Sequence, residues 1–98
     1  MFDVEQTEEF ADWLSGLSDN RAQARISMRI ARLQSGLMGD VKSVGEGIRE
    51  LRIDYGPGYR VYFVQRGKVL VLLLCGGNKS TQDKDIAHAK VLARELEE

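Results

Sequence analysis

The sequence predicts an α+β fold in which helices pack on a mainly antiparallel sheet, in a single domain that spans residues 1–98. Three observations support this prediction. The length suits one domain. The hydrophobic period changes between helical and alternating several times along the chain. The longest apolar run, from Val69 to Cys75, is far too short to cross a membrane and suits an interior strand. The predicted order of elements is β, α, α, β, β, β, α.

The first third of the chain predicts a short strand and two helices. Residues 1–6 alternate apolar and charged side chains, as a strand does. Thr7 is then a suitable N-cap, because two glutamates follow it and apolar residues recur at helical spacing. Those residues are Phe10, Trp13, Leu14 and Leu17. Asp19 or Asn20 can cap a second helix that stops at Gly36, so the two helices form an antiparallel hairpin.

The middle of the chain predicts a connection and a first hairpin of strands. Residues 37–47 hold three glycines and no clear period, which indicates a connection. From Ile48 the pattern alternates, as it does in a strand. One face of this strand carries Leu51, Ile53 and Tyr55, and the other carries Glu50, Arg52 and Asp54. Residues 56–58, Gly-Pro-Gly, force a turn before a strand of β-branched and aromatic residues at 59–65.

The C-terminal third predicts an interior strand and a helix. Arg66 and Gly67 mark a tight reversal, after which residues 69–75 are apolar on both faces. Ser80 and Asp83 have the spacing of a capping box at the start of a helix. The apolar seam of this helix consists of Ile86, Ala89, Ala93 and Leu96.

Charge is sorted along the chain although the formal net charge is only −1. Residues 1–20 contain six acids and no base, whereas residues 21–35 contain four arginines and no acid. These arginines lie about 100° around the predicted helix from its apolar stripe, so they are either a solvated face or a contact for RNA. They are Arg21, Arg25, Arg29 and Arg32, and the stripe is Ala22, Ile26, Ile30 and Leu33. Residues 51–70 carry a local charge of +3.

Several chemistries are excluded by residue counts and spacing. One cysteine and one histidine cannot make a disulfide or a usual zinc site, and the spacing around Lys79 does not fit a phosphate-binding P-loop. Asp83 and Asp85 diverge by about 200° on a helix, which disfavours a shared metal. We therefore expect no cofactor and no metal. Residues 76–81 at the helix start can hold one phosphate or form a plain cap.

One remaining chemistry needs neither a metal nor a protein nucleophile, namely cleavage of RNA by its own 2′-hydroxyl. The enzyme must orient that hydroxyl, neutralise charge that grows on the phosphate, and transfer two protons. Arginine suits the second task because its planar fork matches phosphate oxygens. Arg52, Arg60 and Lys79 are the candidates for it.

Three segments of the chain carry a resemblance to a known family. They are Glu50-Leu51-Arg52, the Gly-Pro-Gly-Tyr-Arg-Val-Tyr-Phe block at 56–63, and the Gly-Gly-x-Lys-x-x-Gln-x-x-Asp-Ile block at 76–86. With them, nearly the whole chain resembles the RelE/ParE superfamily of type II toxin-antitoxin toxins. Within it, the chain is most similar to the addiction module killer proteins, close to the HigB-type toxins.

The resemblance implies a RelE-like fold and a ribosome-dependent mRNA endoribonuclease that works without metal and inhibits translation. Arg60 matches the family's phosphate-contacting arginine, while Arg52 and Lys79 fall where the family places basic residues. RelE itself has a catalytic tyrosine in the segment that is Gln-Asp-Lys-Asp here, at 82–85. Asp85 or Lys84 can take a proton-transfer role in its place, and Asp85 can equally be a helix-start acid. We count Asp85 among the catalytic candidates and Lys84 among the RNA-binding ones.

The same resemblance implies the partners and the alternatives. The partners are a cognate antitoxin, the ribosome with its mRNA, and operator DNA through the antitoxin complex only, in the cytoplasm and without a membrane. ParE-type toxins share the fold but inhibit DNA gyrase and cut nothing. A degenerate toxin that only binds its antitoxin is the third reading.

Overall fold

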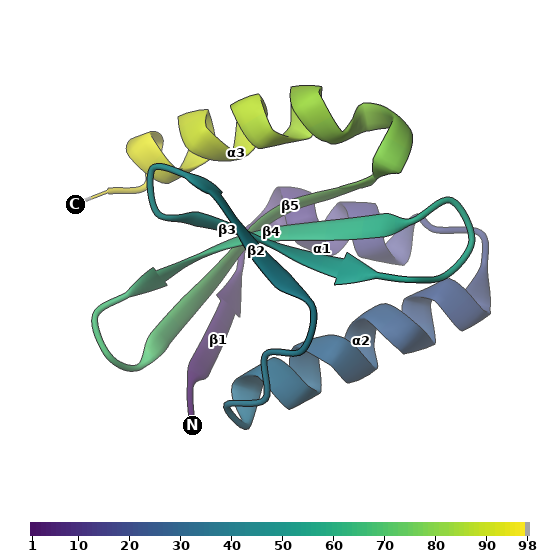
Figure 1. Cartoon of the computed structure of the whole chain (residues 1–98), viewed down its shortest axis with the longest axis horizontal. Coiled ribbons are helices and arrows are strands. Elements are labelled where there is room, and N and C mark those ends of the chain that lie inside the picture. The colour runs from purple at the N-terminus through teal and green to yellow at the C-terminus, as the bar shows by residue number, and fades with distance from the viewer. Residues whose placement is uncertain (98) are drawn as a thin grey trace.

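The computed structural model describes residues 1–97, which form a sheet between two layers of helices (Figure 1). The elements in chain order are β1 (Asp3–Gln6), α1 (Glu8–Ser15), α2 (Asn20–Gln34), β2 (Val41–Gly45), β3 (Ile48–Ile53), β4 (Tyr59–Arg66), β5 (Leu70–Asn78), the 3-10 turn η1 (Lys79–Thr81) and α3 (Gln82–Glu95). The predicted α+β class is confirmed.

The five strands make one mixed sheet in the order β1-β5-β4-β3-β2. Only β1 and β5 pair in parallel, and the other three pairs are antiparallel, so the prediction of a mainly antiparallel sheet is confirmed. As its two apolar faces predict, β5 is an interior strand, between β1 and β4.

The prediction of a mere connection at residues 37–47 is wrong, because this segment contains β2. Strand β2 pairs with β3, with Val41 opposite Leu51 and Ser43 opposite Arg49. It lies at the edge of the sheet, and its two apolar residues, Val41 and Val44, are only half-buried. An edge strand needs little apolar alternation, which explains why the hydrophobic pattern does not reveal it.

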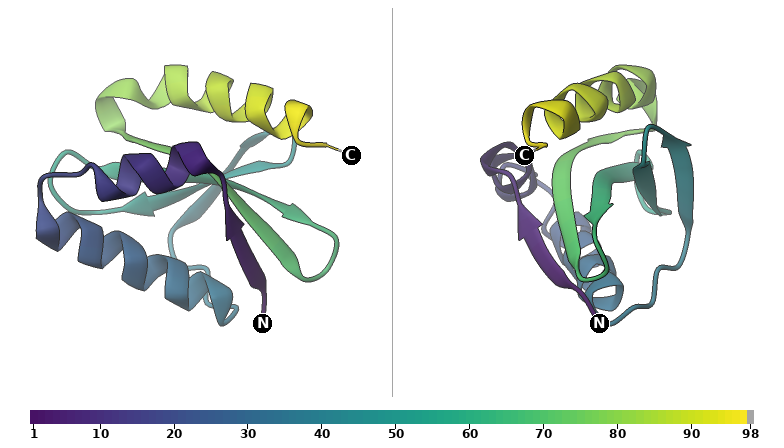
Figure 2. Two further views of the ribbon diagram at one scale, coloured as in Figure 1. Left: turned by 180° about the vertical axis from the view of Figure 1, so that it is seen from behind. Right: turned by 90° about the vertical axis from the view of Figure 1, so that its left-hand side faces the viewer.

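The two faces of the sheet are covered by different helices (Figure 2). Helices α1 and α2 pack on one face, where the core residues are Phe10, Ile26, Leu33, Leu51, Ile53, Val61, Phe63, Val71 and Leu73. Helix α3 packs on the other, over a smaller cluster of Ile48, Tyr62, Val64, Leu74, Cys75 and Ala89. The predicted alternation of β3 is confirmed, since Leu51 and Ile53 lie on the first face.

The helix starts follow the sequence signals closely in the first third of the chain. The Thr7 hydroxyl accepts a hydrogen bond from the Phe10 amide at 3.0 Å and donates one to the Leu74 carbonyl at 2.7 Å. Asp19, rather than Asn20, caps α2, and its carboxylate accepts from the amides of Arg21 and Ala22. The Thr7 cap joins the helical hairpin to β5, and Asp19 joins it to the β3–β4 turn by accepting a hydrogen bond from the Tyr55 hydroxyl.

The predicted start of the last helix is wrong in detail. Strand β5 does not end at Cys75 but continues through Gly76 and Gly77 to Asn78. The capping box lies between Asn78 and Thr81 rather than between Ser80 and Asp83. Glycine breaks the apolar pattern without breaking the strand, because both glycines are needed where other side chains approach the backbone closely.

Candidate functional site

A cleft of about 480 Å³ lies on the face of the sheet that carries α3, beyond the part that α3 covers. Residues from the loop before β2, from β3, the β3–β4 turn, β4 and η1 line it. They are Asp40, Arg52, Ile53, Asp54, Gly56, Pro57, Gly58, Arg60 and Lys79. Three of the four predicted catalytic residues, Arg52, Arg60 and Lys79, therefore meet in one cleft.

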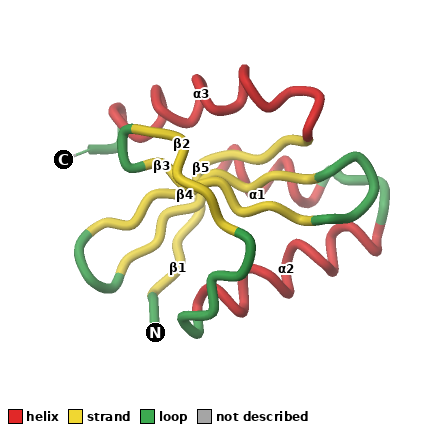
Figure 3. The backbone as a smooth tube through the Cα atoms, viewed as in Figure 1, coloured by secondary structure: helices red, strands yellow, loops and turns green. Residues whose placement is uncertain are grey.

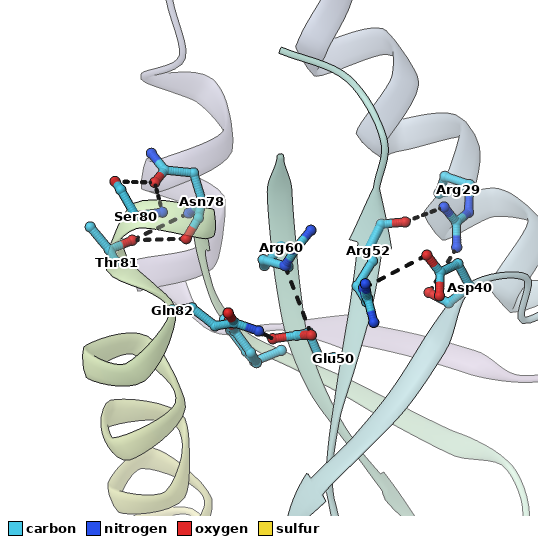
Figure 4. A network of polar contacts seen from close by, with 10 residues as sticks. Arg29, Asp40, Glu50, Arg52, Arg60, Asn78, Ser80, Thr81 and Gln82 are labelled. Atoms are coloured by element: carbon cyan, nitrogen blue, oxygen red, sulfur yellow. Dashed lines mark hydrogen bonds and ion pairs between the residues drawn. The ribbon is translucent and has the colours of Figure 1, made fainter. Parts of the chain in front are cut away.

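Arg60 and Arg52 occupy directly opposite positions on β4 and β3. Like charges at such positions repel, so each arginine needs an acid close by. The Arg60 Nε atom lies 3.8 Å from Glu50 Oε1, and the Arg52 Nε atom lies 3.7 Å from Asp40 Oδ2 (Figure 4). Arg60 is only 8% exposed, whereas the Arg52 side chain is 39% exposed. The two arginines thus present one buried cation and one more exposed cation to the same space.

Glu50 stands behind Arg60 and is fully buried. Its Oε2 atom accepts a hydrogen bond from Gln82 Nε2 at 2.7 Å (Figure 4). The same atom accepts a second one from the Tyr62 hydroxyl at 3.0 Å. Burial, and then the hydrogen bond to Glu50, raises the pKa of Tyr62 far above its usual value, so this tyrosine is a permanent donor. Glu50 is not among the predicted site residues. The sequence could have indicated it, because Glu50 lies two residues before Arg52 and so on the same face of the strand.

Lys79 reaches the cleft from η1, which is anchored on both sides. Its amide donates to the Pro57 carbonyl at 3.4 Å, which joins η1 to the β3–β4 turn. Gly58 in this turn has a φ of 78°, a left-handed conformation that glycine adopts without strain.

The start of the last helix favours the plain-cap reading over a phosphate site. The side-chain Oδ1 atom of Asn78 accepts from the Ser80 amide at 2.9 Å and from the Ser80 hydroxyl at 2.6 Å. The Asn78 amide donates in turn to the Thr81 hydroxyl at 3.3 Å. The chain's own side chains therefore occupy polar groups that a phosphate would use.

Asp85, the fourth predicted catalytic residue, does not line the cleft. Its carboxylate accepts a hydrogen bond from the Thr81 hydroxyl and lies against Gly77 of β5. A Cβ at Gly77 would overlap the Asp85 carboxylate. Lys84 is exposed and lines a separate shallow hollow with residues 79–83.

The predicted arginine stripe of α2 divides into three kinds of residue. Arg29 donates to the carbonyls of Arg52 at 2.6 Å and Asp40 at 3.4 Å (Figure 4). It also donates to the Met38 carbonyl at 3.3 Å, so it holds the loop before β2. The Arg25 guanidinium lies over the Tyr55 ring, 4.7 Å from its centre. Arg21 and Arg32 are exposed.

The remaining polar and reactive groups lie elsewhere. Cys75 is buried, and this burial raises the pKa of its thiol to about 12, as expected for an unreactive cysteine. His88 Nε2 lies 2.8 Å from Glu9 and links α3 to α1. In residues 1–97, no group of three or more His, Cys, Asp or Glu side chains is placed to hold a metal ion. No helix in this part of the chain is long and apolar enough to cross a membrane.

A second hollow, of about 500 Å³, lies between β1 and the helical hairpin. It is slightly larger than the cleft, but its lining residues include no cation. They are Val4, Glu5, Gln6, Leu14, Ser27, Ile30 and Leu73. The cleft around Arg60 is therefore the better candidate for an anionic ligand.

The fold and the cleft define an α+β protein with a five-stranded mixed sheet and a group of cations beside its C-terminal helix. Residues 12–97 match the phage-derived protein Gp49-like family (DUF891), and the chain belongs to this family. It is 60% identical over 93 residues to an uncharacterized protein of Haemophilus influenzae, which covers 95% of this chain and 94% of the relative.

A solved structure has a similar fold. The solution structure of the conserved hypothetical protein HP0894 from Helicobacter pylori matches with a TM-score of 0.50 at 18% identity. The match covers 82% of this chain and 97% of that one. At this level of identity the likeness concerns the fold alone.

Proposed function

We propose that the protein is the toxin of a type II toxin-antitoxin module, a HigB-like member of the RelE/ParE superfamily that cleaves mRNA on the ribosome. The observation that carries the proposal is the meeting of Arg52, Arg60 and Lys79 in one cleft. A cleft with three cations from separate elements fits a phosphate of an RNA chain. Membership of the Gp49-like family and the α+β order of elements, which agrees with the resemblance to RelE-type toxins, support the same assignment.

In this proposal the RNA supplies the nucleophile and the protein supplies charge and geometry. The 2′-hydroxyl attacks the adjacent phosphorus, a 2′,3′-cyclic phosphate forms, and the 5′-oxygen of the next nucleotide leaves. Arg60 and Lys79 stabilise the negative charge that grows on the phosphate oxygens. Arg52, which is more exposed, binds the neighbouring phosphate.

Proton transfer needs a carboxylate or another polar group within reach of the reacting oxygens. We expected Asp85 in this role, but the Thr81 hydroxyl and Gly77 hold its carboxylate outside the cleft lining. Asp40 is paired with Arg52, whereas Asp54 lines the cleft and is exposed. We therefore place the proton acceptor at Asp54 and test it by comparing Asp54→Asn with Asp85→Asn.

The proposed partner is an antitoxin with an acidic segment that covers the cleft and thereby blocks Arg52, Arg60 and Lys79. Operator DNA is contacted by this complex through the antitoxin. The exposed Arg21 and Arg32 of α2, with Arg25 and Lys84, are the proposed contacts for ribosomal RNA. Charge reversal at Arg21 and Arg32 should then weaken ribosome binding and lower its dependence on salt.

A binding toxin of the ParE type is the second candidate, and one observation favours it. Asp40 and Asp54 line the cleft together with the three cations, and Glu50 lies directly behind. These acids offset much of the positive charge, which weakens long-range attraction of RNA. Such a mixed surface also suits a protein partner such as gyrase.

Primer extension on a reporter mRNA separates these candidates. The purified protein is incubated with the mRNA in the presence and absence of translating ribosomes. In-frame cuts that need ribosomes support the nuclease, and an absence of cuts together with inhibited gyrase supercoiling supports the binding toxin. Arg60→Ala and Lys79→Ala should each lower cleavage by at least about tenfold. Lys68→Ala, at an exposed lysine of the β4–β5 turn, is the matched control and should cleave normally.

A further inference from the structure

The buried Glu50 carboxylate connects three elements that meet at the cleft. It extends from β3, accepts from Tyr62 of β4 and Gln82 of α3, and faces Arg60 of β4. A charged group buried without partners is costly, and here the two hydrogen bonds both go to Oε2. The Oε1 atom has no hydrogen bond from residues 1–97 and is left for Arg60.

Arg60 is held by this carboxylate at one edge only. Its Nε atom lies 3.8 Å from Oε1, beyond hydrogen-bond distance, and has no other partner among the described residues. The terminal Nη1 atom lies 3.7 Å from the place of a Cβ on Gly58, a residue of the cleft wall. Figure 4 shows the end of the guanidinium turned away from Glu50. The charge of Glu50 thus faces one edge of Arg60, while its terminal N–H groups make no hydrogen bond within residues 1–97.

The same carboxylate fixes the element that carries Lys79. Gln82 is the first residue of α3 and directly follows η1, so its bond to Glu50 ties the start of α3 to the sheet. Lys79 belongs to η1 and is joined to the β3–β4 turn as well. One buried side chain therefore contacts both Arg60 and the helix start that follows Lys79.

We propose that Glu50 is a positioning residue that preorganises Arg60 and the start of α3 for a phosphate in the cleft. The expected effect on cleavage rests on the proposed function. The expected rigidity of Arg60 rests on the geometry alone. An arginine side chain loses rotamer entropy when it is fixed. Glu50 meets this cost before the ligand binds, so the benefit appears in the transition state.

The decisive variant is Glu50→Gln, with Tyr62→Phe as its matched control. Glutamine keeps the shape and an oxygen that accepts from Tyr62 and Gln82, but it removes the charge that faces Arg60. Phenylalanine at 62 removes one of the hydrogen bonds and keeps the charge. We expect Glu50→Gln to lower the single-turnover rate of ribosome-dependent cleavage by at least about tenfold with little change in KM. We expect Tyr62→Phe to stay within about threefold of the wild type, and Glu50→Asp to recover part of the rate.

A second measurement follows Arg60 without any cleavage assay. Relaxation of the Arg60 Nε–Hε signal in ¹⁵N NMR should show a rigid side chain, with an order parameter above about 0.8, in the wild type and Tyr62→Phe. It should fall below about 0.6 in Glu50→Gln. A mobile Arg60 in the wild type overturns the proposal, even if Glu50→Gln does not fold.

The two proposals fail in different ways. If Arg60→Ala cleaved mRNA at the wild-type rate, the cleft would not be the nuclease site. The NMR measurement would then still test whether Glu50 holds Arg60 in place. Alternatively, Arg60→Ala could impair cleavage while Glu50→Gln cleaves normally and keeps a rigid Arg60. That result would refute only the role of Glu50 and leave the nuclease site intact.

Discussion

The two faces of the sheet differ in how fully helices cover them. The α1–α2 face is apolar along its length, and Phe10, Ile26 and Leu33 fill it from the helices. The α3 face is apolar only under the helix, around Tyr62, Leu74 and Ala89. At the start of α3 it carries the buried Glu50, and beyond α3 it carries Arg52 and Arg60, where the cleft opens.

This difference indicates a division of tasks within one small sheet. Burial of apolar area on the first face supplies most of the stability, because each large side chain removed from water contributes about 1.5–3 kcal/mol. The uncovered part of the second face contributes little in this way and keeps charged groups in fixed positions. Substitutions on the first face should therefore change stability, and those on the second should change activity.

The largest expected effect is the loss of stability caused by Phe10→Ala on the α1–α2 face. Phe10 is fully buried between α1 and the sheet, so the truncation leaves a cavity and should cost about 3–5 kcal/mol of unfolding free energy. Urea denaturation followed by circular dichroism measures it. Exposed Met28→Ala on α2 is the control and should change stability by less than about 0.5 kcal/mol. Equal losses in the two variants would contradict the assigned core.

The neighbouring glycines of β5 allow a direct comparison of the two faces. An added Cβ at Gly76 would meet the Trp13 ring on the α1 side, and at Gly77 it would meet Asp85 and Thr81 on the α3 side. Each alanine variant should cost about 1–3 kcal/mol, since the packed neighbour must move. Trp13 is the only tryptophan, so its fluorescence should shift in Gly76→Ala and stay unchanged in Gly77→Ala. A shift in both would mean that the faces are not independent.

The sequence predicts the covered face better than the cleft, and the reason is physical. Thr7, Asp19 and the alternation of β3 are local signals, which neighbouring residues alone determine. The burial of Glu50 depends on where α3 comes to rest, which is a tertiary contact. The same holds for Asp85, whose distance from the cleft follows from its packing against Gly77.

The sequence predicts that three cations lie near one another, but it does not predict the contacts that hold them in place. Arg52 and Arg60 follow from strand register, and Lys79 from the end of β5. The role of Arg29 could not be predicted, because its partners are backbone carbonyls of a loop whose path the sequence pattern does not define. Strand β2 was missed for a related reason, since its pairing with β3 rather than its composition makes it a strand.

A smaller effect is expected from Arg52, at the exposed side of the cleft. Arg52 is held to Asp40 at 3.7 Å and makes no hydrogen bond through Nε within residues 1–97. If it acts as a charge, Arg52→Lys should cleave within about threefold of the wild type and Arg52→Ala up to about tenfold more slowly. Unfolding midpoints should stay close to the wild type in both. Equal damage from lysine and alanine would instead indicate a bidentate phosphate contact.

The smallest effect concerns a hydrogen bond that joins the α1–α2 hairpin to the β3–β4 turn, which forms part of the cleft wall. The α1–α2 loop and the β3–β4 turn lie at the same end of the molecule (Figure 3). There the Tyr55 hydroxyl donates to Asp19 at 3.0 Å. This bond is the main cause that lowers the pKa of Asp19, aided by the α2 amides and by Arg21. Asp19 is therefore stabilising while it is ionised.

Because the folded pKa of Asp19 lies below its unfolded value of about 3.9, its contribution is complete above that value and disappears as the pH falls through the folded pKa. Tyr55→Phe should lower the thermal unfolding midpoint by a constant amount between about pH 5 and 8. The gap to the wild type should close below about pH 4. Tyr59→Phe, whose ring packs edge-on against Trp13 in the core, is the control and should show no such dependence. A gap that persists at about pH 2 would mean that the Tyr55 hydroxyl stabilises the fold independently of the charge on Asp19, since phenylalanine keeps the ring that packs under Arg25.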